Sequence, residues 1–113
     1  MKLLTAAVIK QLEANPLYST EKKNVTPVLV KLFAPWNGYT LYVIEGERVT
    51  NEDGSIDWKL FGLVTGLNED ELGYTMLSEL ESVRGRFGLK IERDMHFAGM
   101  MLDKSNNEVR RAS

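Results

Sequence analysis

Cysteine is absent from this chain of 113 residues, and histidine occurs once, at His96. The lack of cysteine excludes disulfide frameworks, thiolate metal sites and cysteine nucleophiles, and it is typical of proteins in the reducing cytoplasm. A single histidine means that one chain cannot supply two imidazole ligands to a metal. We therefore expect a cytoplasmic protein with no cofactor and no metal site.

Long apolar runs are also missing. The N-terminal segment MKLLTAAVIKQLEA contains a short apolar run, but Lys10 and Gln11 interrupt it before the core of a signal peptide could form. No run approaches the roughly 20 residues that cross a membrane. We expect no membrane partner and, from the length of the chain, a single domain.

An excess of positive charge is missing as well, since the net charge is −2, and this argues against binding to a nucleic-acid backbone. The charges are unevenly distributed. Residues 1–44 carry five lysines against two glutamates, residues 45–81 ten acids against two bases, and residues 82–113 seven bases against four acids. The acidic middle third indicates either solvated hairpin loops or a contact surface for a basic partner. The basic last third keeps single-stranded nucleic-acid binding open as an alternative.

Hydrophobic periodicity predicts an α+β fold. Thr5 can cap a first helix, Asn15-Pro16 ends it, and Asp53-Gly54 favours a hairpin turn. We predict an antiparallel sheet of about four to five strands, with an N-terminal helix and one short helix before the last strand. The predicted elements are a helix at 5–13, strands at 28–33, 39–45, 57–65 and 89–97, and a short helix between Ser78 and Gly85.

Residues 1–99 are predicted to form one α+β domain, and residues 100–113 a C-terminal tail. The tail sequence has no sustained hydrophobic period. We therefore expect Met100–Leu102 to dock on the domain and the last residues to be mobile.

Individual residues inside these elements give three more specific predictions. Gly62 interrupts an alternating strand pattern, which indicates a bulge or the close approach of another backbone. Ser78 and Glu81 have the spacing of a capping box. Arg93 shares a strand face with apolar residues, so we expect it to form a buried ion pair with Glu81 or, alternatively, with Glu79.

The residue types suited to a metal or to acid–base chemistry occur together at Glu92, Asp94 and His96, which alternation would place on one side of the last strand. A half-exposed strand has the same pattern, so we interpret them as structural and keep a metal-assisted hydrolase or nuclease as an alternative. The basic turn RGRFGLK (84–90) could hold a phosphate, but a helix C-terminus is electrostatically unfavourable for an anion. Neither Ser78 nor Ser82 has the surroundings of a catalytic nucleophile, and no catalytic residue is predicted.

The run FGLVTGLNEDELGYTMLSELESVRGRFGLKIERDMHF (61–97), with LLT near the start, PLYSTE in the first loop and VKLFAP before the first turn, resembles the domain-of-unknown-function 2958 family. The resemblance implies a small single-domain protein carried by bacterial plasmids, integrative elements and phages. It implies no catalytic mechanism. The chain departs from the family pattern at Tyr39–Tyr42, where an aromatic-rich segment is usual, at His96, where tyrosine is usual, and at Arg86, where proline is common.

The family signature runs from Leu72 to Asp94, and its polar positions are our candidate binding residues. They are Tyr74, Ser78, Glu79, Glu81, Arg84, Glu92, Arg93 and Asp94.

The resemblance and the lack of a chemical motif together favour a binding protein over an enzyme. We expect a mobile genetic element accessory protein that binds another protein, one with a basic surface, and serves anti-defence or element maintenance.

Overall fold

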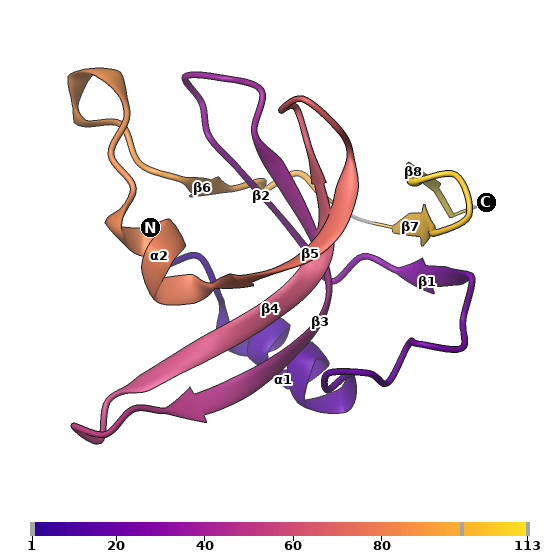
Figure 1. The fold of residues 1–113 in the computed structure, drawn as a ribbon, viewed down its shortest axis with the longest axis horizontal. Helices are drawn as coiled ribbons and strands as arrows, with labels where there is room; N and C mark the ends of the chain where they lie inside the picture. Colours follow the sequence, from indigo (N-terminus) through magenta and orange to yellow (C-terminus); the bar gives the residue numbers. More distant parts are fainter. Residues whose placement is uncertain (1, 98, 113) are drawn as a thin grey trace.

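The computed structural model describes residues 2–97 and 99–112, so residues 1 and 98 of the predicted domain and residue 113 of the predicted tail lie outside the described part. The fold is α+β, as predicted, but it contains two antiparallel sheets (Figure 1). The larger sheet has the strand order β5-β4-β3-β2-β6, and the smaller one has the order β1-β7-β8. The elements are α1 (Ala6–Ala14), β1 (Val25–Pro27), β2 (Val30–Phe33), β3 (Thr40–Thr50), β4 (Ile56–Thr65), β5 (Glu71–Met76), α2 (Leu77–Ser82), the 3-10 turn η1 (Arg86–Gly88), β6 (Glu92–Arg93), β7 (Met100–Asp103) and β8 (Glu108–Arg111).

The centre of the larger sheet is the long hairpin of β3 and β4 (Figure 1). Its turn contains Asp53 and Gly54, and the backbone of Gly54 has a φ of 85°, as the Asp-Gly pair predicts. β3 continues to Thr50, beyond the predicted end at residue 45. Residues 46–50, which include the charged Glu47 and Arg48, belong to the strand because they pair in register with residues 56–60.

The side chains of this hairpin alternate between two cores, with Val43 on one face of the sheet and Ile44 on the other. A bulge shifts the register of β3 between Val43 and Glu45. Gly62 lies opposite the bulge, where a Cβ would come within 1.9 Å of the Tyr42 carbonyl oxygen. The close approach of another backbone, one of the two alternatives predicted for Gly62, is therefore confirmed, and the bulge lies in the neighbouring strand β3.

The two helices cover one face of the larger sheet, and the smaller sheet covers part of the other. α1 begins at the predicted cap, where the Thr5 hydroxyl accepts the Val8 N–H at 3.2 Å. Its Leu12 is fully buried against Gly46 of β3. The first core also contains Leu32, Leu41, Leu60, Leu80 and Ile91, and the second contains Val28, Ile44, Leu63 and Leu102.

Two predicted strands are wrong in their extent. The run 28–33 is not one strand, because β1 in the smaller sheet ends at Pro27 and β2 in the larger sheet begins at Val30. The predicted strand 89–97 is reduced to the two residues of β6. Leu89 is 41% exposed and Met95 69% exposed, so the apolar alternation there does not mark a buried face.

The C-terminal segment forms a hairpin that the sequence analysis did not predict. Met100–Leu102, which we expected to dock, lie in β7, where Met101 and Leu102 pair with β1. Glu108–Arg111 form β8, which pairs with β7 and leaves Val109 against the second core. Within the described residues, no helix is long and apolar enough to cross a membrane.

Candidate functional site

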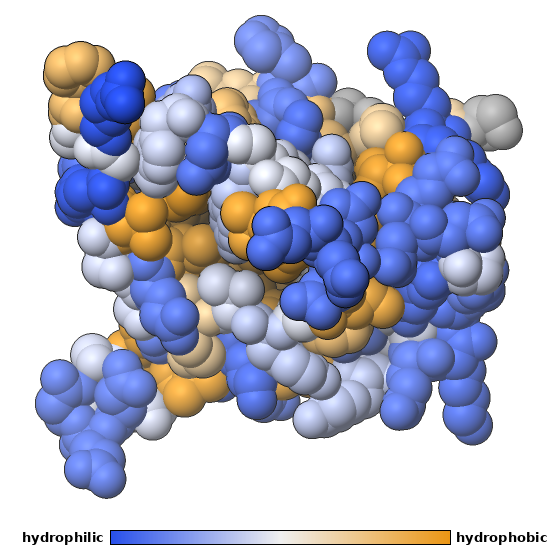
Figure 2. Space-filling model, turned by 45° about the horizontal axis from the view of Figure 1, so that its top comes forward, coloured by the Kyte–Doolittle hydropathy of each residue, from blue (hydrophilic) through white to orange (hydrophobic). Residues whose placement is uncertain are grey.

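A concave apolar site lies beside α2, between the β2–β3 turn and the β4–β5 turn. Its volume is about 410 Å³. Figure 2 shows apolar side chains gathered in a hollow on this side of the molecule. We call it the α2 groove, and its apolar lining is Ala34, Trp36, Tyr39, Leu67, Leu80, Val83 and Ile91.

Glycine contacts fix the walls of the α2 groove. The two turns meet at Gly38 and Gly66, where a Cβ on Gly66 would lie 1.6 Å from the Gly38 carbonyl oxygen. Gly66 also has a φ of 85°, a backbone conformation that glycine adopts without strain. On the other side, a Cβ on Gly85 would lie 2.1 Å from the Trp36 indole. The groove is therefore formed by backbones and rings in direct contact, which favours a preformed site.

One end of the α2 groove is polar. Burial raises the pKa of the Tyr39 phenol; a side-chain hydrogen bond with Thr75 partly offsets this, and the charge of Glu79 raises the pKa further. The phenol is therefore neutral at physiological pH and available as a hydrogen-bond donor. Glu79 and Thr75 also line the groove, so a bound segment would meet a carboxylate and two hydroxyl groups here.

A closed loop follows α2 and projects beside the groove. We call residues 84–90 the Phe87 loop; it is the orange segment at the upper left of Figure 1. Arg84 donates from Nη1 to the carbonyls of Glu81 (2.7 Å) and Val83 (2.9 Å), which satisfies the end of the helix. The backbones of Arg84 and Lys90 form an antiparallel β-bridge across the base of the loop. Phe87, at the tip of the loop, is 92% exposed and has a φ of 61°.

The candidate residues from the sequence do not form one site. Glu79 and Arg84 line the α2 groove. Glu81 lines a separate depression with Leu3 and Lys90. Tyr74 lies on the opposite face of the sheet, where its ring centroid is 4.7 Å from that of Phe61.

Ser78 has a structural contact in place of the predicted capping box. The N-cap of α2 is Met76, with no side-chain cap hydrogen bond. The Ser78 backbone N–H and hydroxyl both donate to the carboxylate of Asp57, which also accepts the Trp58 N–H at 2.7 Å. Burial alone raises the pKa of Asp57, but the hydrogen bonds from Ser78 and Trp58 outweigh it and leave the pKa below its usual value.

Arg93 lies on the predicted face but has a different contact from the one predicted. It is opposite the fully buried Leu32, so its side chain is on the helix-covered side of the sheet. Its Nη1 donates to the backbone carbonyl of Lys2 rather than to the predicted carboxylate of Glu81 or Glu79. This bond ties the N-terminal segment to the edge strand β6.

The strand that was expected to align Glu92, Asp94 and His96 ends at Arg93. Asp94 forms an ion pair with Lys31 at 3.3 Å and accepts the His96 N–H at 2.9 Å. That backbone hydrogen bond is the main reason why the pKa of Asp94 is lowered. Among the described residues, no group of three or more histidines and carboxylates is placed to hold a metal.

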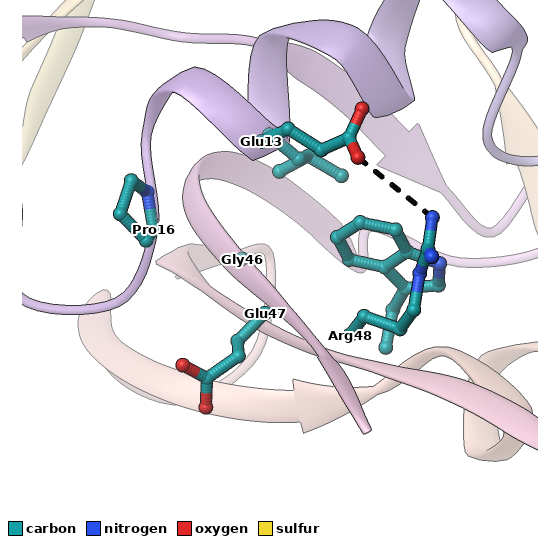
Figure 3. Close-up of a pocket in the computed structure, with 7 residues that line it drawn as sticks. Glu13, Pro16, Gly46, Glu47 and Arg48 are labelled. Carbon is teal, nitrogen blue, oxygen red and sulfur yellow. Dashed lines mark ion pairs between the residues drawn. The ribbon is translucent and has the colours of Figure 1, made fainter. Parts of the chain in front are cut away.

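A second depression has an ion pair across it. It has a volume of about 330 Å³ and lies between α1 and β3 (Figure 3). Glu13 and Arg48 form an ion pair across it at 3.8 Å, and the Arg48 guanidinium lies 5.5 Å from the Trp58 ring centre. The ion pair engages two of the three charged residues that line this depression, the third being Glu47.

A buried carboxylate holds the loop between α1 and β1. Glu45 is 2% exposed and accepts the N–H groups of Tyr18 and Thr20, both at 2.8 Å, and the Thr20 hydroxyl. Lys104 donates to the carbonyl and hydroxyl of Thr20. Protein groups thus satisfy the carboxylate, and we interpret Glu45 as an anchor for residues 16–24.

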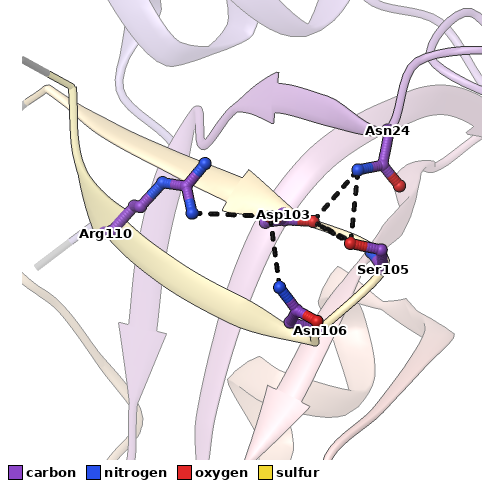
Figure 4. A network of polar contacts seen from close by, with 5 residues as sticks. All are labelled: Asn24, Asp103, Ser105, Asn106 and Arg110. Atoms are coloured by element: carbon purple, nitrogen blue, oxygen red, sulfur yellow. Dashed lines mark hydrogen bonds and ion pairs between the residues drawn. The ribbon is translucent and has the colours of Figure 1, made fainter.

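A second carboxylate organises the C-terminal hairpin. Asp103 accepts the Asn24 side-chain amide at 3.1 Å, the Ser105 N–H at 3.0 Å and the Ser105 hydroxyl at 2.6 Å, and it pairs with Arg110 at 3.4 Å (Figure 4). The Ser105 hydroxyl contributes most to lowering the pKa of Asp103. This network accounts for the tight turn between β7 and β8.

Sequence reasoning missed most of the α2 groove. The sequence analysis made no prediction for Trp36 or Leu67, named Tyr39 only as part of a departure from the family pattern, and included Phe87 only in the basic turn. One usable signal was present, since Trp36 and Leu67 are large apolar residues in turns, where polar residues are usual.

The fold and the groove define this chain as a small two-sheet α+β protein with an apolar groove beside α2. Residues 3–105 match the family described as Protein of unknown function (DUF2958), and the chain belongs to this family. Neither curated proteins nor solved structures give a significant match.

Proposed function

We propose that this protein acts by binding another protein, and that the α2 groove is the contact surface. The observation that carries the proposal is an apolar concavity of about 410 Å³ with a polar end formed by Tyr39, Thr75 and Glu79. Apolar pockets with a few convergent polar groups are the usual form of binding sites. Leu67 (60% exposed) and Val83 (37% exposed) extend the apolar surface beyond the groove, as a protein partner requires.

The chemistry of the groove favours binding over catalysis. A neutral phenol, a threonine and one carboxylate are its polar groups besides Arg84 and Asn37. The Arg84 guanidinium is engaged with the helix carbonyls, so it is not directed at a reacting atom. A nucleophile next to a base, which a hydrolase needs, is not among these lining residues.

Charge near the groove favours a basic partner. Glu69 and Asp70 are exposed on the β4–β5 turn that carries Leu67, and Glu79 and Glu81 are exposed on α2. Acidic groups on two sides of an apolar groove attract a partner with lysine or arginine around an apolar anchor. The family's occurrence on plasmids, integrative elements and phages leads us to propose a host defence protein or an element maintenance protein of the cytoplasm as that partner.

The experiment is affinity capture from host cells with two matched variants. Leu67→Arg places a positive charge on the groove wall. Ile56→Arg places the same charge at the first residue of β4, which is exposed to a similar extent (55%). We expect a partner that is retained by the wild type and by Ile56→Arg but lost with Leu67→Arg. Equal retention by both variants would exclude the groove as the contact.

The two alternatives have their own outcomes in the same preparation. A stoichiometric metal that is lost in Glu92→Ala would favour the hydrolase or nuclease. A submicromolar, strongly salt-dependent complex with single-stranded DNA would favour nucleic-acid binding through the basic last third.

A further inference from the structure

The most exposed large apolar side chain is Phe87, and its backbone conformation holds it outward. Among the described large apolar residues it has the highest exposure, 92%, and its φ of 61° lies in the left-handed region that residues other than glycine rarely adopt. Three cations, Arg84, Arg86 and Lys90, lie in the same seven-residue loop, which contains no acid. The loop thus presents an aromatic side chain with positive charge around it.

Phe87 is held away from the α2 groove of its own chain. The Gly85 N–H donates to the Leu89 carbonyl at 2.7 Å, and the Gly88 N–H donates to the Gly85 carbonyl at 3.1 Å, so the loop is closed on itself. Gly85 packs directly on Trp36 at the groove wall, which fixes the base of the loop beside the groove. The tip therefore projects from the rim of a groove that it does not fill.

The α2 groove has the properties that the tip of the loop requires. Its apolar lining suits an aromatic ring, and the Tyr39 and Glu79 end suits a neighbouring cation. The groove and the loop also lie on the same side of the molecule. Two copies related by a two-fold axis could therefore exchange tips at the same time, which makes a closed interface instead of an open chain.

We propose that the chain forms a two-fold homodimer in which Phe87 of each copy enters the α2 groove of the other, with Arg86 near the partner's Glu79. The inference rests on the proposed function of the groove as a binding surface, and it names a second copy as one of its occupants. In this dimer the α2 groove of each copy is covered by the Phe87 loop of the other copy. Another partner competes with the exchanged Phe87, so dilution of the protein exposes the groove.

The interface is small, because each copy contributes one aromatic anchor and its immediate surroundings. Interfaces below about 1,200 Å² in total belong to weak or transient complexes. We therefore expect a dissociation constant in the range of about 1 to 100 μM, and concentration-dependent dimerisation in solution.

Sedimentation velocity over a concentration series tests the proposal without any partner. The wild type should pass from monomer to dimer across the micromolar range. Phe87→Ala should remain monomeric, whereas Ile56→Ala, which removes another exposed apolar side chain, should dimerise like the wild type. Since both side chains are largely exposed, equal melting temperatures will show that the two variants are folded.

A mixing experiment distinguishes an exchange of tips from any other dimer. Phe87→Ala keeps the groove and lacks the tip, and Leu67→Arg keeps the tip and blocks the groove. Each variant alone should be monomeric, but an equimolar mixture restores one of the two tip-in-groove contacts and should form heterodimers at higher concentrations, approaching about 1 mM, than the wild type needs. A wild type that is monomeric at every concentration, a Phe87→Ala variant that dimerises, or a mixture that associates no more than either variant alone at about 1 mM would each overturn the proposal.

The charge pair gives an independent readout. Arg86→Glu and Glu79→Arg should each weaken dimerisation about 10-fold, and the double variant should recover part of the loss. No recovery would refute the placement of Arg86 near Glu79. Failure of dimerisation leaves the captured partner unaffected, and failure of capture leaves the sedimentation result unaffected, so the two proposals can fail separately.

Discussion

Replacing Glu45 with glutamine tests whether one buried carboxylate holds the first loop on the sheet. Glutamine has the same shape, so no cavity forms and packing is preserved. The carboxylate accepts three hydrogen bonds, from the Tyr18 N–H, the Thr20 N–H and the Thr20 hydroxyl. An amide has one oxygen, and its NH₂ group must face at least one of these donors.

Either orientation of the new amide leaves one backbone N–H without an acceptor, at Tyr18, where it is partly buried, or at Thr20, where it is buried. If the amide nitrogen faces Tyr18, the backbone N–H of Tyr18 loses its acceptor. If the nitrogen faces Thr20, the Thr20 hydroxyl can rotate and accept a hydrogen bond from it, but the Thr20 N–H is left without an acceptor. A buried donor without a partner costs about 1 to 3 kcal/mol, and hydrogen bonds to a charged acceptor are roughly 1 kcal/mol stronger than neutral ones. We expect Glu45→Gln to lower the free energy of unfolding by about 3 kcal/mol.

Urea unfolding monitored by tryptophan fluorescence measures this loss. With a slope of about 1.5 kcal/mol per M, the midpoint should fall by about 2 M. Glu47→Gln, two residues along the same strand and exposed, is the control and should leave the midpoint unchanged. Hydrogen exchange should become faster at the Tyr18 and Thr20 amides. If both variants unfold at the same urea concentration, Glu45 does not anchor the loop and the reasoning is wrong.

Three further predictions concern the helices and the groove. Because the pKa of Asp57 is lowered by folding, its contribution to stability is present above the unfolded pKa of about 3.9 and is lost as the pH falls through the lower folded value. The free energy of unfolding, followed by circular dichroism as the pH is lowered, should therefore depend less on pH in Asp57→Asn than in the wild type. A Ser78→Ala variant should begin to unfold at a higher pH than the wild type. Gly85→Ala forces a Cβ against the Trp36 indole and should cost about 1 to 3 kcal/mol in urea unfolding, with a shift in tryptophan emission; an unchanged emission spectrum would show that the ring does not rest on Gly85. Leu12→Ala, at a fully buried position, should cost about 3 to 5 kcal/mol, and a loss below 1 kcal/mol would contradict the packing of α1 on β3.

The parts of the fold that could be predicted from the sequence depend on local signals. The Thr5 cap and Asn15-Pro16 define α1, and Asp53-Gly54 defines the turn of the long hairpin. The interior Gly62 indicated the bulge. In each case the residues that carry the signal are neighbours in the chain or lie on one strand.

The parts that could not be predicted depend on partners that are distant in the sequence. Ser78 has the spacing of a capping box, but Asp57, 21 residues earlier, competes for its hydroxyl and N–H. The apolar run 28–33 hides the change of sheet, because nothing in its pattern marks the transfer of the chain between two cores. β8 contains one apolar residue, Val109, so its pairing with β7 has little periodic signal.

The candidate site is a stronger case of the same limit. Its lining comes from the β2–β3 turn, the β4–β5 turn, α2 and Ile91, and no one segment has the composition of a binding site. Glu79 and Arg84 were identified as candidates from the family signature. The apolar wall was not, because Trp36 and Leu67 meet only after both turns are in place.

The pairing of β1 with β7 determines when this protein can complete its fold during synthesis. Val25 is opposite Asp103, so the smaller sheet closes a loop of more than 70 residues. At about 5 to 20 residues per second, several seconds pass between the emergence of β1 from the ribosome and that of β7. During this interval Ile44 and Leu63 lack the cover that Leu102 provides. We expect the nascent chain to expose this apolar face to chaperones, and the C-terminal hairpin to be the last structure to form.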